Sequence, residues 1–240
     1  MTNLVIDYGN SSAKVGIFED HTLSDKLVIS DTAELKKFLS ESQIENFIVS
    51  SVSHDAVEVS SWAINAKRKF ILHHTLPLPI TNRYGTPTTL GPDRLAGVCG
   101  AHQMFPGKNS LVIDAGTCIT YDFIDSAGSF LGGGISPGLS MRFQAVHTFT
   151  KKLPLVPRVD QIGLIGTNTG ECIQSGVING LIEEINGIIS RYQEKFTDLR
   201  VIFCGGDVHF FENKLKASIF AVPELVLSGL NSILIYNVNR

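Results

Sequence analysis

Two short segments of the chain place a carboxylate and a glycine turn directly after an apolar run. The letters LVIDYG occupy 4–9, and the letters LVIDAG occupy 111–116. A tight turn at the end of a buried strand presents backbone N–H groups toward solvent, and a carboxylate beside that turn can hold a cation. Each segment therefore predicts a site for a metal-bound polyphosphate.

The two segments repeat each other at a single spacing. Asp7 and Asp114 lie 107 positions apart (114 − 7 = 107), the other matching residues keep that offset, and Asn10 stands where Thr117 does. Packing explains a shared apolar strand, but it does not dictate the residues of the turn. The identity through the turn favours two similar halves that face one nucleotide.

A third glycine turn, with the letters GGD at 205–207, follows another short apolar run. Glycine lets a ligand approach the backbone closely. The sequence contains no GxxxxGK[ST] P-loop and no convincing GxGxxG dinucleotide turn. We expect the first two turns to hold phosphates and the third to lie under the purine and ribose.

The first half of the chain reads as a three-strand meander followed by alternating helices and strands. Apolar residues at helical spacing, with a cap at Asp31 or Thr32, predict the first helix. In the second helix we expect Val57, Trp62 and Ile64 to be partly buried. The predicted elements are strands over 3–8, 12–18 and 23–30, a helix over 32–41, a strand over 47–52, a helix over 54–67 and a strand over 70–72.

The second half repeats this plan after a turn at 107–109. A meander with crossover helices is typical of an α/β domain with a mixed sheet. We therefore expect half-domains at 1–107 and 108–240. The predicted elements are strands over 111–114, 119–125 and 129–135, a helix over 138–149, a loop over 150–167, a long helix over 169–196, a strand over 201–203, a short helix, a strand near 218–222 and a final helix from about 224.

Residues 75–93 form a long segment rich in proline, glycine and threonine. A segment too irregular for one element and too long for a plain connection is often a substrate loop. A helix begins at its end, where Pro92 suits the first turn and the helix dipole favours the carboxylate of Asp93. The residue types alone leave open whether Asp93 only stabilises the helix start or also takes part in chemistry.

The composition fits a compact protein without a strongly charged surface. The chain has 240 residues, 43% hydrophobic content and a net charge of −3. This balance argues against a nucleic-acid-binding surface, and no apolar run approaches the ~20 residues of a membrane span. We expect no secretory leader and a cytoplasmic location. The cysteines are far apart and favour reduced, mostly buried thiols at Cys99, Cys118, Cys172 and Cys204.

Six motifs spread over nearly the whole chain together resemble those of the type III pantothenate kinases, bacterial enzymes of coenzyme A biosynthesis. The motifs are DYGNSSAK (7–14), Tyr84 with GPDR (91–94), DAGT (114–117), GGGISPG (132–138), NTGECIQSG (168–176) and GGD (205–207). The resemblance implies two ribonuclease H-like (actin-like ATPase) half-domains with mixed sheets and a nucleotide cleft between them. It also implies a homodimer.

The same resemblance implies ATP-dependent phosphorylation of the primary hydroxyl of pantothenate, with Mg²⁺ and a monovalent cation, K⁺ or NH₄⁺. Asp93 is the implied general base, and Asp114 is the implied ligand of the monovalent cation. ATP contacts are implied for Asp7, Tyr8, Gly9, Asn10, Ser11, Ser12, Ala13, Lys14 and Thr117. Substrate contacts are implied for Tyr84, Gly91, Pro92, Asp93, Arg94 and Thr169.

Three points stay open from the sequence. The side chain of Lys14 can reach a phosphate or face solvent. The guanidinium of Arg94 can pair with the substrate carboxylate or with the transferring phosphate. The long helix over 169–196 is either a dimer surface or a helix buried within one monomer.

Two other functions compete with the kinase interpretation: another small-molecule kinase of the superfold, and a non-catalytic regulator such as a transcriptional accessory homologue. Tyr84 and the GPDR segment argue against the first, because they belong to the substrate side. The presence of Asp7, Asp93 and Asp114 argues against the second. An actin-like assembly or chaperone ATPase is disfavoured, because 240 residues cannot hold its added subdomains.

Overall fold

The computed structural model describes residues 1–240, which form two compact units. Unit 1 comprises Met1–Gly107, Ile124–Gly132 and Glu224–Arg240, and unit 2 comprises Lys108–Phe123 and Gly133–Pro223. The chain therefore passes from unit 1 to unit 2 after Gly107 and returns to unit 1 for its last helix.

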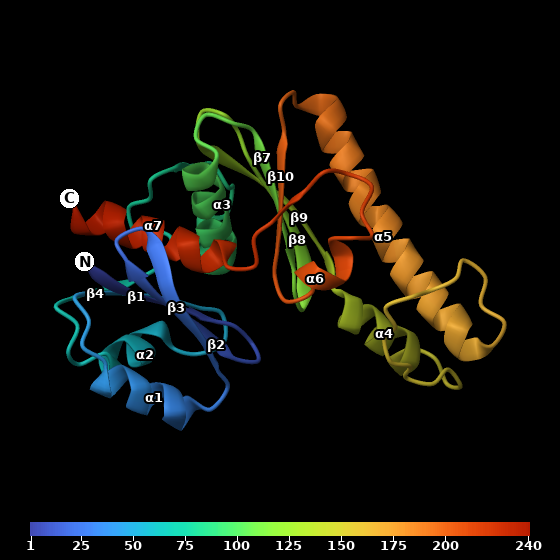
Figure 1. Cartoon of the computed structure of the whole chain (residues 1–240), viewed down its shortest axis with the longest axis horizontal. Helices are drawn as coiled ribbons and strands as arrows, with labels where there is room; N and C mark the ends of the chain where they lie inside the picture. Colours follow the sequence, from blue (N-terminus) through green and yellow to red (C-terminus); the bar gives the residue numbers. More distant parts are fainter. The chain divides into compact units, whose positions relative to one another are not determined.

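A five-stranded mixed sheet forms the centre of unit 1 (Figure 1). Its strand order is β3-β2-β1-β4-β5, in which β1, β2 and β3 are antiparallel neighbours and β1, β4 and β5 run parallel. The strands are β1 (Thr2–Tyr8), β2 (Ala13–Glu19), β3 (Thr22–Ile29), β4 (Asn46–Ser51) and β5 (Arg68–Ile71).

Alternation along β1 sends its side chains to two opposite faces of this sheet. Helices α1 (Thr32–Glu41) and α2 (Ala56–Trp62) cover one face. The core on that face joins strand residues to both helices and includes Leu4, Ile6, Tyr8, Val15, Leu35, Leu39, Phe47, Val59 and Trp62. Asp7 points the other way, since it lies between two residues of this core.

Helix α7 (Leu225–Val238) packs on the opposite face through a chain of buried amides. Asn3 of β1 donates to Asn231 Oδ1 over 2.8 Å, and Asn46 of β4 donates to Asn3 Oδ1 over 2.9 Å. The three side chains are 1 to 3% exposed. Each buried amide is paired, so the network fixes where the last helix sits against the first strand.

Helix α3 (Pro92–Met104) packs directly against α7. A Cβ built on Gly229 of α7 would lie 1.8 Å from the carbonyl oxygen of Ala96 in α3. Only glycine permits this approach of two helix backbones. The sequence gives Gly229 no special context, so this pairing of helices from distant parts of the chain is a finding of the structure.

The second sheet has the strand order β11-β10-β7-β8-β9-β6. The tip of the β8–β9 hairpin belongs to unit 1, where Thr81 of β6 pairs with Ser129 of β9. The strands are β6 (Thr81–Asn82), β7 (Ser110–Ala115), β8 (Cys118–Ile124), β9 (Ser129–Pro137), β10 (Arg200–Cys204) and β11 (Phe220–Ala221).

The two sheets share one topology. Apart from β6, which pairs with β9, the order β9-β8-β7-β10-β11 repeats β3-β2-β1-β4-β5, and β7, β10 and β11 are parallel as β1, β4 and β5 are. In this correspondence Asp7 pairs with Ser50, and Asp114 pairs with Cys204. The predicted class of two α/β units with mixed sheets is confirmed.

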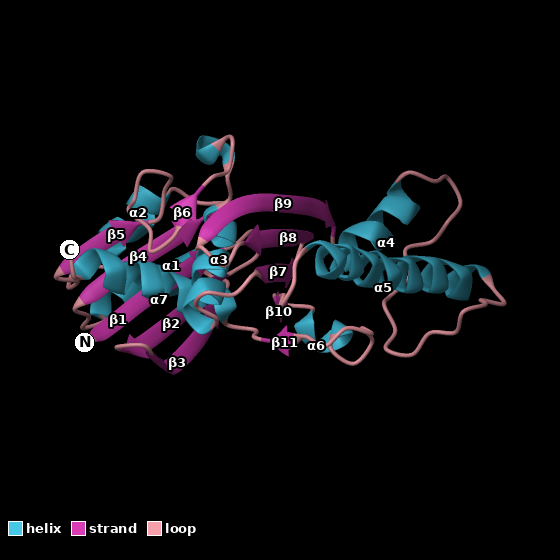
Figure 2. Cartoon of the chain, turned by 90° about the horizontal axis from the view of Figure 1, so that it is seen from above, coloured by secondary structure: helices cyan, strands magenta, loops and turns pink.

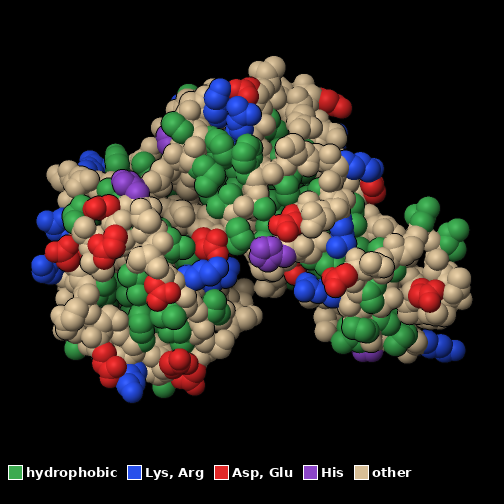
Figure 3. Space-filling view, viewed as in Figure 1, with side chains coloured by type: hydrophobic (Ala, Val, Ile, Leu, Met, Phe, Trp, Pro, Cys, Tyr) green, Lys and Arg blue, Asp and Glu red, His purple; other side chains and the backbone are tan.

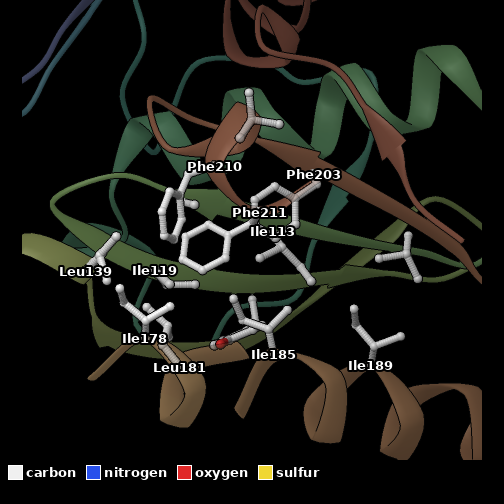
Figure 4. Packing of buried hydrophobic residues seen from close by; sticks show 14 of the residues in the cluster. Ile113, Ile119, Leu139, Ile178, Leu181, Ile185, Ile189, Phe203, Phe210 and Phe211 are labelled. Carbon is white, nitrogen blue, oxygen red and sulfur yellow. The ribbon is translucent and has the colours of Figure 1, made fainter. Parts of the chain in front are cut away.

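Unit 2 buries its core between the second sheet and helix α5 (Thr169–Lys195), which is continuous in Figure 2. One stripe of α5 faces the strands, while α6 (Val208–Phe211) adds aromatic side chains to the same core. Helix α4 (Leu139–Thr148) also contributes to it. Figure 4 labels members of this core: Ile113, Ile119, Leu139, Ile178, Leu181, Ile185, Ile189, Phe203, Phe210 and Phe211.

The prediction for the second helix was wrong in length and partly wrong in burial. Helix α2 begins after Asp55, whose carboxylate accepts from the N–H of Val57 over 2.8 Å, and it ends at Trp62. Trp62 is buried, but Val57 and Ile64 are 66% and 65% exposed. The face that packs inward is the one shared by Val59 and Trp62, at three-residue spacing.

All four cysteines are free thiols. Cys99 and Cys204 are buried, Cys118 is partly buried and Cys172 is exposed, so the predicted burial holds for two of them fully. Burial raises the pKa of the Cys99 thiol well above its usual range. None of the helices combines the length and the apolarity that crossing a bilayer requires.

Candidate active site

Asp7 is the residue before the last of β1, and it is only 8% exposed. The Ser50 hydroxyl donates to its Oδ1 over 3.1 Å. Burial raises the pKa of Asp7, the charge of Lys14 lowers it, and the charge of Asp93 raises it. Asp7 is thus a carboxylate whose ionised form is costly in this fold, which suits a place where a cation binds.

The turn after Asp7 is closed by a hydrogen bond from the N–H of Gly9 to the carbonyl of Ser12 (3.1 Å). Asn10 and Ser11 are exposed at its tip. The side chains of Tyr8 and Ala13, by contrast, are buried in the core of unit 1. These two predicted contact residues can therefore reach a ligand only through their backbone.

Lys14 lies directly opposite Asp7 in the β1–β2 pair. Facing residues of an antiparallel pair project to the same side of the sheet. The ammonium lowers the pKa of Asp7 through its charge, so its field acts at this carboxylate. The half-buried Lys14 is a cation beside the turn and does not simply project into solvent.

Asp93 occupies the first turn of α3, which begins at Pro92 after Gly91. Its Oδ1 accepts from the N–H of Arg94 over 2.9 Å. The charge of Asp93 raises the pKa of Asp7, so Asp93 lies within electrostatic range of that carboxylate. The predicted base and the predicted phosphate turn, 86 residues apart in sequence (93 − 7 = 86), are thus brought together in unit 1.

Tyr84 and Arg94 form part of a stack beside this pair. The Arg94 guanidinium lies 5.5 Å from the centre of the Tyr84 ring, which is the range of a cation–π contact. The other partner of Tyr84 is Phe130, whose ring is nearly parallel at 6.0 Å. The sequence analysis missed Phe130, because an apolar residue in a strand carries no signal for such a role.

In unit 2, Asp114 and Thr117 flank the turn between β7 and β8. The N–H of Gly116 donates to the carbonyl of Cys118 (3.0 Å), and the Thr117 side chain is exposed. The N–H of Gly138 donates to the Thr117 carbonyl over 3.1 Å. A Cβ on Gly138 would lie 2.3 Å from the Gly116 carbonyl oxygen, so backbone packs on backbone here.

The third glycine turn packs against the same element. Gly205 has a φ of +94°, and a Cβ built on it would lie 2.4 Å from Asp114 Oδ1. The N–H of Asp207 donates to the Ala115 carbonyl over 3.0 Å, and Arg158 pairs with Asp207 over 2.6 Å. The predicted turns at 114–117 and 205–207 therefore meet within unit 2.

Thr169 is the exposed first residue of α5, after the cap Asn168. Polar residues in the first turns of α5 hold the preceding loop: Gln174 donates to the Pro157 carbonyl (2.8 Å), and Ser175 donates to the Leu164 carbonyl (2.7 Å). The sequence analysis did not assign these two roles.

An ion pair that the sequence analysis also missed braces the glycine-rich strand β9. Arg142 Nη2 donates to Glu184 Oε2 over 2.6 Å and to Ser136 Oγ over 2.8 Å. The hydroxyl of Tyr121 donates to Glu184 Oε1 over 3.1 Å. Burial raises the pKa of Glu184, but the hydrogen bonds from Ser136 and Arg142 outweigh it, and the net pKa is lowered.

The oxygen-rich residues at both turns fit hard cations. No group of three or more His, Cys, Asp or Glu side chains gathers at one place, so a cage of protein ligands is absent. Mg²⁺ keeps most of its waters and needs only one or two carboxylates. Asp7, buried and near a second carboxylate, suits that role, and Asp114 beside backbone carbonyls suits a monovalent cation.

Comparison with known proteins identifies the family. The type III pantothenate kinase family model matches residues 3–191. A type III pantothenate kinase of Bacteroides fragilis is 43% identical over 242 residues, covering 99% of each chain. The chain belongs to the type III pantothenate kinase family.

A family member from Christiangramia forsetii is also 43% identical, over 248 residues and 98% of each chain. One from Porphyromonas gingivalis is 38% identical over 242 residues. Since these alignments cover nearly the full length, the six motifs lie within one continuous match and not in a shared fragment.

Solved structures match the fold at low identity. A Campylobacter jejuni protein that carries the name of the Baf transcriptional activators has a TM-score of 0.66 at 22% identity, covering 99% of this chain and all of that one. An activator of 2-hydroxyisocaproyl-CoA dehydratase from Clostridium difficile, with bound ADPNP, has a TM-score of 0.54 at 14% identity, covering 100% and 95%. A ROK hexokinase from Thermus thermophilus has a TM-score of 0.54 at 13% identity, covering 100% and 99%. These matches support the actin-like fold alone.

Proposed function

We propose that this chain transfers the γ-phosphoryl group of ATP to the primary hydroxyl of pantothenate, which yields ADP and 4′-phosphopantothenate and begins coenzyme A biosynthesis. Membership of the type III pantothenate kinase family supports the substrate and the reaction. The observation that carries the proposal is the position of Asp93 in the first turn of α3, near enough to the buried Asp7 that its charge raises the pKa of Asp7.

Asp93 is the general base of the proposed reaction. As the oxygen of the substrate hydroxyl bonds to phosphorus and the bond to the ADP oxygen breaks, the hydroxyl proton passes to the carboxylate of Asp93. A position in the first turn of α3 suits a carboxylate, because the N-terminus of a helix carries partial positive charge. The N–H of Arg94 already donates to Oδ1, which fixes the orientation of the carboxylate.

The remaining residues of unit 1 bind and orient the two substrates. We assign phosphate contacts to the amides and hydroxyls of the turn over 9–12 and to Lys14. Gly91, Pro92, Tyr84 and Arg94 line the pantothenate pocket. Arg94 is 8% exposed and packed on Tyr84, so its charge is fixed in one place and suits a carboxylate or a phosphate oxygen.

In unit 2 we assign an ATP contact to Thr117 and a pantothenate contact to Thr169. Asp114 holds the monovalent cation, K⁺ or NH₄⁺, with backbone oxygens. Asp7 would hold Mg²⁺. When bound, these cations would supply positive charge beside the phosphates and would offset the charge of the buried Asp7 carboxylate.

The test is ADP release from ATP with and without pantothenate, and with and without K⁺ or NH₄⁺. Asp93→Asn removes the base but keeps the shape, so turnover falls about 10²-fold or more. Asp25→Asn, at an exposed position on β3, is the matched control and leaves turnover unchanged. A wild type that binds ATP but shows no pantothenate-dependent turnover would instead favour another small-molecule kinase of the fold or a regulatory role.

The homodimer implied by the family is also part of the proposal, with α4, α5 and the loop between them as its surface. Large apolar side chains are exposed there, among them Phe149 at 86%, Leu164 at 83% and Ile165 at 82%. Figure 3 shows hydrophobic side chains on this part of unit 2. Gly176 and Gly180 of α5 face open space, which allows a second backbone to approach closely.

Sedimentation velocity tests the dimer. Phe149→Asp together with Ile165→Asp places two charges on the proposed surface, and a shift from dimer to monomer is expected. The matched control is Val28→Asp, an exposed apolar position of unit 1. A wild type that sediments as a monomer at micromolar concentration contradicts this part of the proposal.

A further inference from the structure

The repeated topology pairs two loops that differ completely in sequence. Because Ser50 pairs with Asp7 and Cys204 pairs with Asp114, the segment after β4 is the counterpart of the glycine turn after β10. The first segment has the letters SVSH at 51–54, and the second has GGDV at 205–208. The counterpart of the GGD turn therefore carries hydroxyls and an imidazole, and the proposed function gives it no role.

Ser53 and His54 contact the turn that follows Asp7. The Ser53 hydroxyl donates to the Gly9 carbonyl over 2.7 Å. The His54 ring stacks on Tyr8 with centres 4.1 Å apart and planes 14° apart, and its Nε2 lies 3.4 Å from the Tyr8 hydroxyl. The two contacts therefore involve Tyr8 and Gly9, the residues that precede the exposed tip of the turn.

The loop that carries these side chains is itself fixed. Ser51 Oγ donates to the His54 carbonyl over 2.8 Å and accepts from the His54 N–H over 3.0 Å. The N–H of Val52 donates to the Tyr8 carbonyl over 3.1 Å. A third contact, 3.1 Å between Ser53 Oγ and His54 Nδ1, joins the two bracing side chains.

We propose that Ser53 and His54 are positioning residues that hold the Gly9–Ser12 turn in the shape that receives the ATP phosphates. This inference rests on the proposed function of that turn. The hydrogen bond from Ser53 to the Gly9 carbonyl fixes the orientation of the peptide plane after Gly9. It thereby also orients the N–H groups that follow in the turn. The His54 stack covers Tyr8, whose hydroxyl is held by Thr32 Oγ1 at 3.0 Å.

The physical argument is one of preorganisation. The turn has one internal hydrogen bond, from Gly9 to Ser12, and its tip residues are exposed. Without an outside brace, ordering it on ATP binding costs conformational entropy that lowers affinity. Neither Ser53 nor His54 needs to touch the nucleotide for this effect.

The test compares Ser53→Ala, His54→Ala and His54→Phe by steady-state kinetics and by amide hydrogen exchange without ligand. Loss of one hydrogen bond or one ring stack raises the KM for ATP about 3- to 10-fold. The KM for pantothenate and kcat stay within about 2-fold of wild type, since each variant changes one contact. Amides over 9–12 exchange faster in both alanine variants. His54→Phe keeps the stack and recovers most of the loss.

His74→Ala is the matched control, an exposed histidine of unit 1 that contacts only the adjacent His73 ring and leaves all readouts unchanged. The proposal is overturned if Ser53→Ala and His54→Ala leave both the exchange over 9–12 and the KM for ATP as in wild type. It is equally overturned if they lower only the melting temperature. If the wild type shows no turnover with pantothenate, the proposed function fails, while the exchange comparison still decides whether the brace exists.

Discussion

The turn after Asp7 and the turn after Asp114 both follow the letters LVID, but they are supported by different means. In unit 1, side chains brace the turn: Ser50 holds the carboxylate, and Ser53 and His54 hold the residues that follow. In unit 2, Gly138 and Gly205 let backbone pack directly on backbone. A duplicated strand and turn can therefore keep its geometry while the support around it diverges.

The difference also concerns charge. The buried Asp7 is destabilising when ionised, because burial raises its pKa and Asp93 adds a like charge. In unit 2, hydrogen bonds from Ser136 and Arg142 favour the ionised form of Glu184, so its pKa is lowered. One carboxylate, for which we propose a role in cation binding, costs stability when it is ionised, and the other supports the fold.

Asp7→Asn gives the largest expected effect and separates these two kinds of carboxylate. Turnover falls about 10²-fold or more, because a charge beside the reacting phosphates is lost. The melting temperature at pH 7 rises instead, because the buried charge is removed. The rise is about 2–4 °C for each kcal/mol by which the free energy of unfolding increases. A raised pKa means that Asp7 stabilises the fold only at low pH and ceases to do so as pH rises through its folded pKa.

The gain in melting temperature from Asp7→Asn therefore shrinks as pH falls toward 3.8, the usual pKa of this carboxyl group. Thermal melts of both proteins across this range measure it. If Asp7→Asn is less stable than wild type at pH 7, the ionised Asp7 does not destabilise the fold, and this prediction is wrong.

Gly205→Ala tests the backbone support of the second turn. The added Cβ meets Asp114 Oδ1 and the Ala115 carbonyl in a residue whose φ is +94°. We expect a loss of about 1–3 kcal/mol and a turnover reduced about 10-fold at fixed ATP, measured by denaturant unfolding and ADP release. Gly206→Ala is the control, since a Cβ there meets nothing within 4 Å.

Glu184→Gln tests the ionic brace near the second turn. The lowered pKa means that this carboxylate contributes stability above its usual pKa of 4.5, and the contribution is lost as pH falls through the folded pKa. The free energy of unfolding of the variant is expected to be about 1–2 kcal/mol lower than that of wild type at pH 7. This difference shrinks in acid, as it does for Asp7→Asn, but here the variant is the less stable protein. Glu183→Gln, which is 61% exposed, should change the free energy of unfolding by no more than a few tenths of a kcal/mol.

Ser50→Ala gives the smallest expected effect and sharpens the comparison at the carboxylate itself. Loss of its hydrogen bond raises the pKa of Asp7 further, because this bond lowers it in the wild type. We expect the variant to be about 1 kcal/mol less stable than wild type at pH 7. The difference becomes smaller in acid, because a protonated Asp7 depends less on the Ser50 hydroxyl. Ser24→Ala, an exposed serine that donates to a carbonyl, is the control in the same melts.

Much of the local structure could be predicted from the sequence. The strand ends at Asp7 and Asp114, the start of α3 at Pro92 and the long α5 follow from apolar periodicity, caps and turn residues, which act over a few positions. The 107-residue echo also predicted two sheets of one plan, and the repeated strand order confirms it. The predicted half-domains at 1–107 and 108–240 stay a prediction.

Only the tertiary structure decided which distant residues meet. Phe130 stacks on Tyr84, Glu184 pairs with Arg142, and Gly229 brings α7 against α3, although none of these residues stands out in the sequence. Such contacts depend on long-range packing and close backbone approach, which leave no periodic or local signal. The sequence by itself determined the two turns and the chemistry they could support, while packing alone brought Asp93 to Asp7 and set Ser53 and His54 against the first turn.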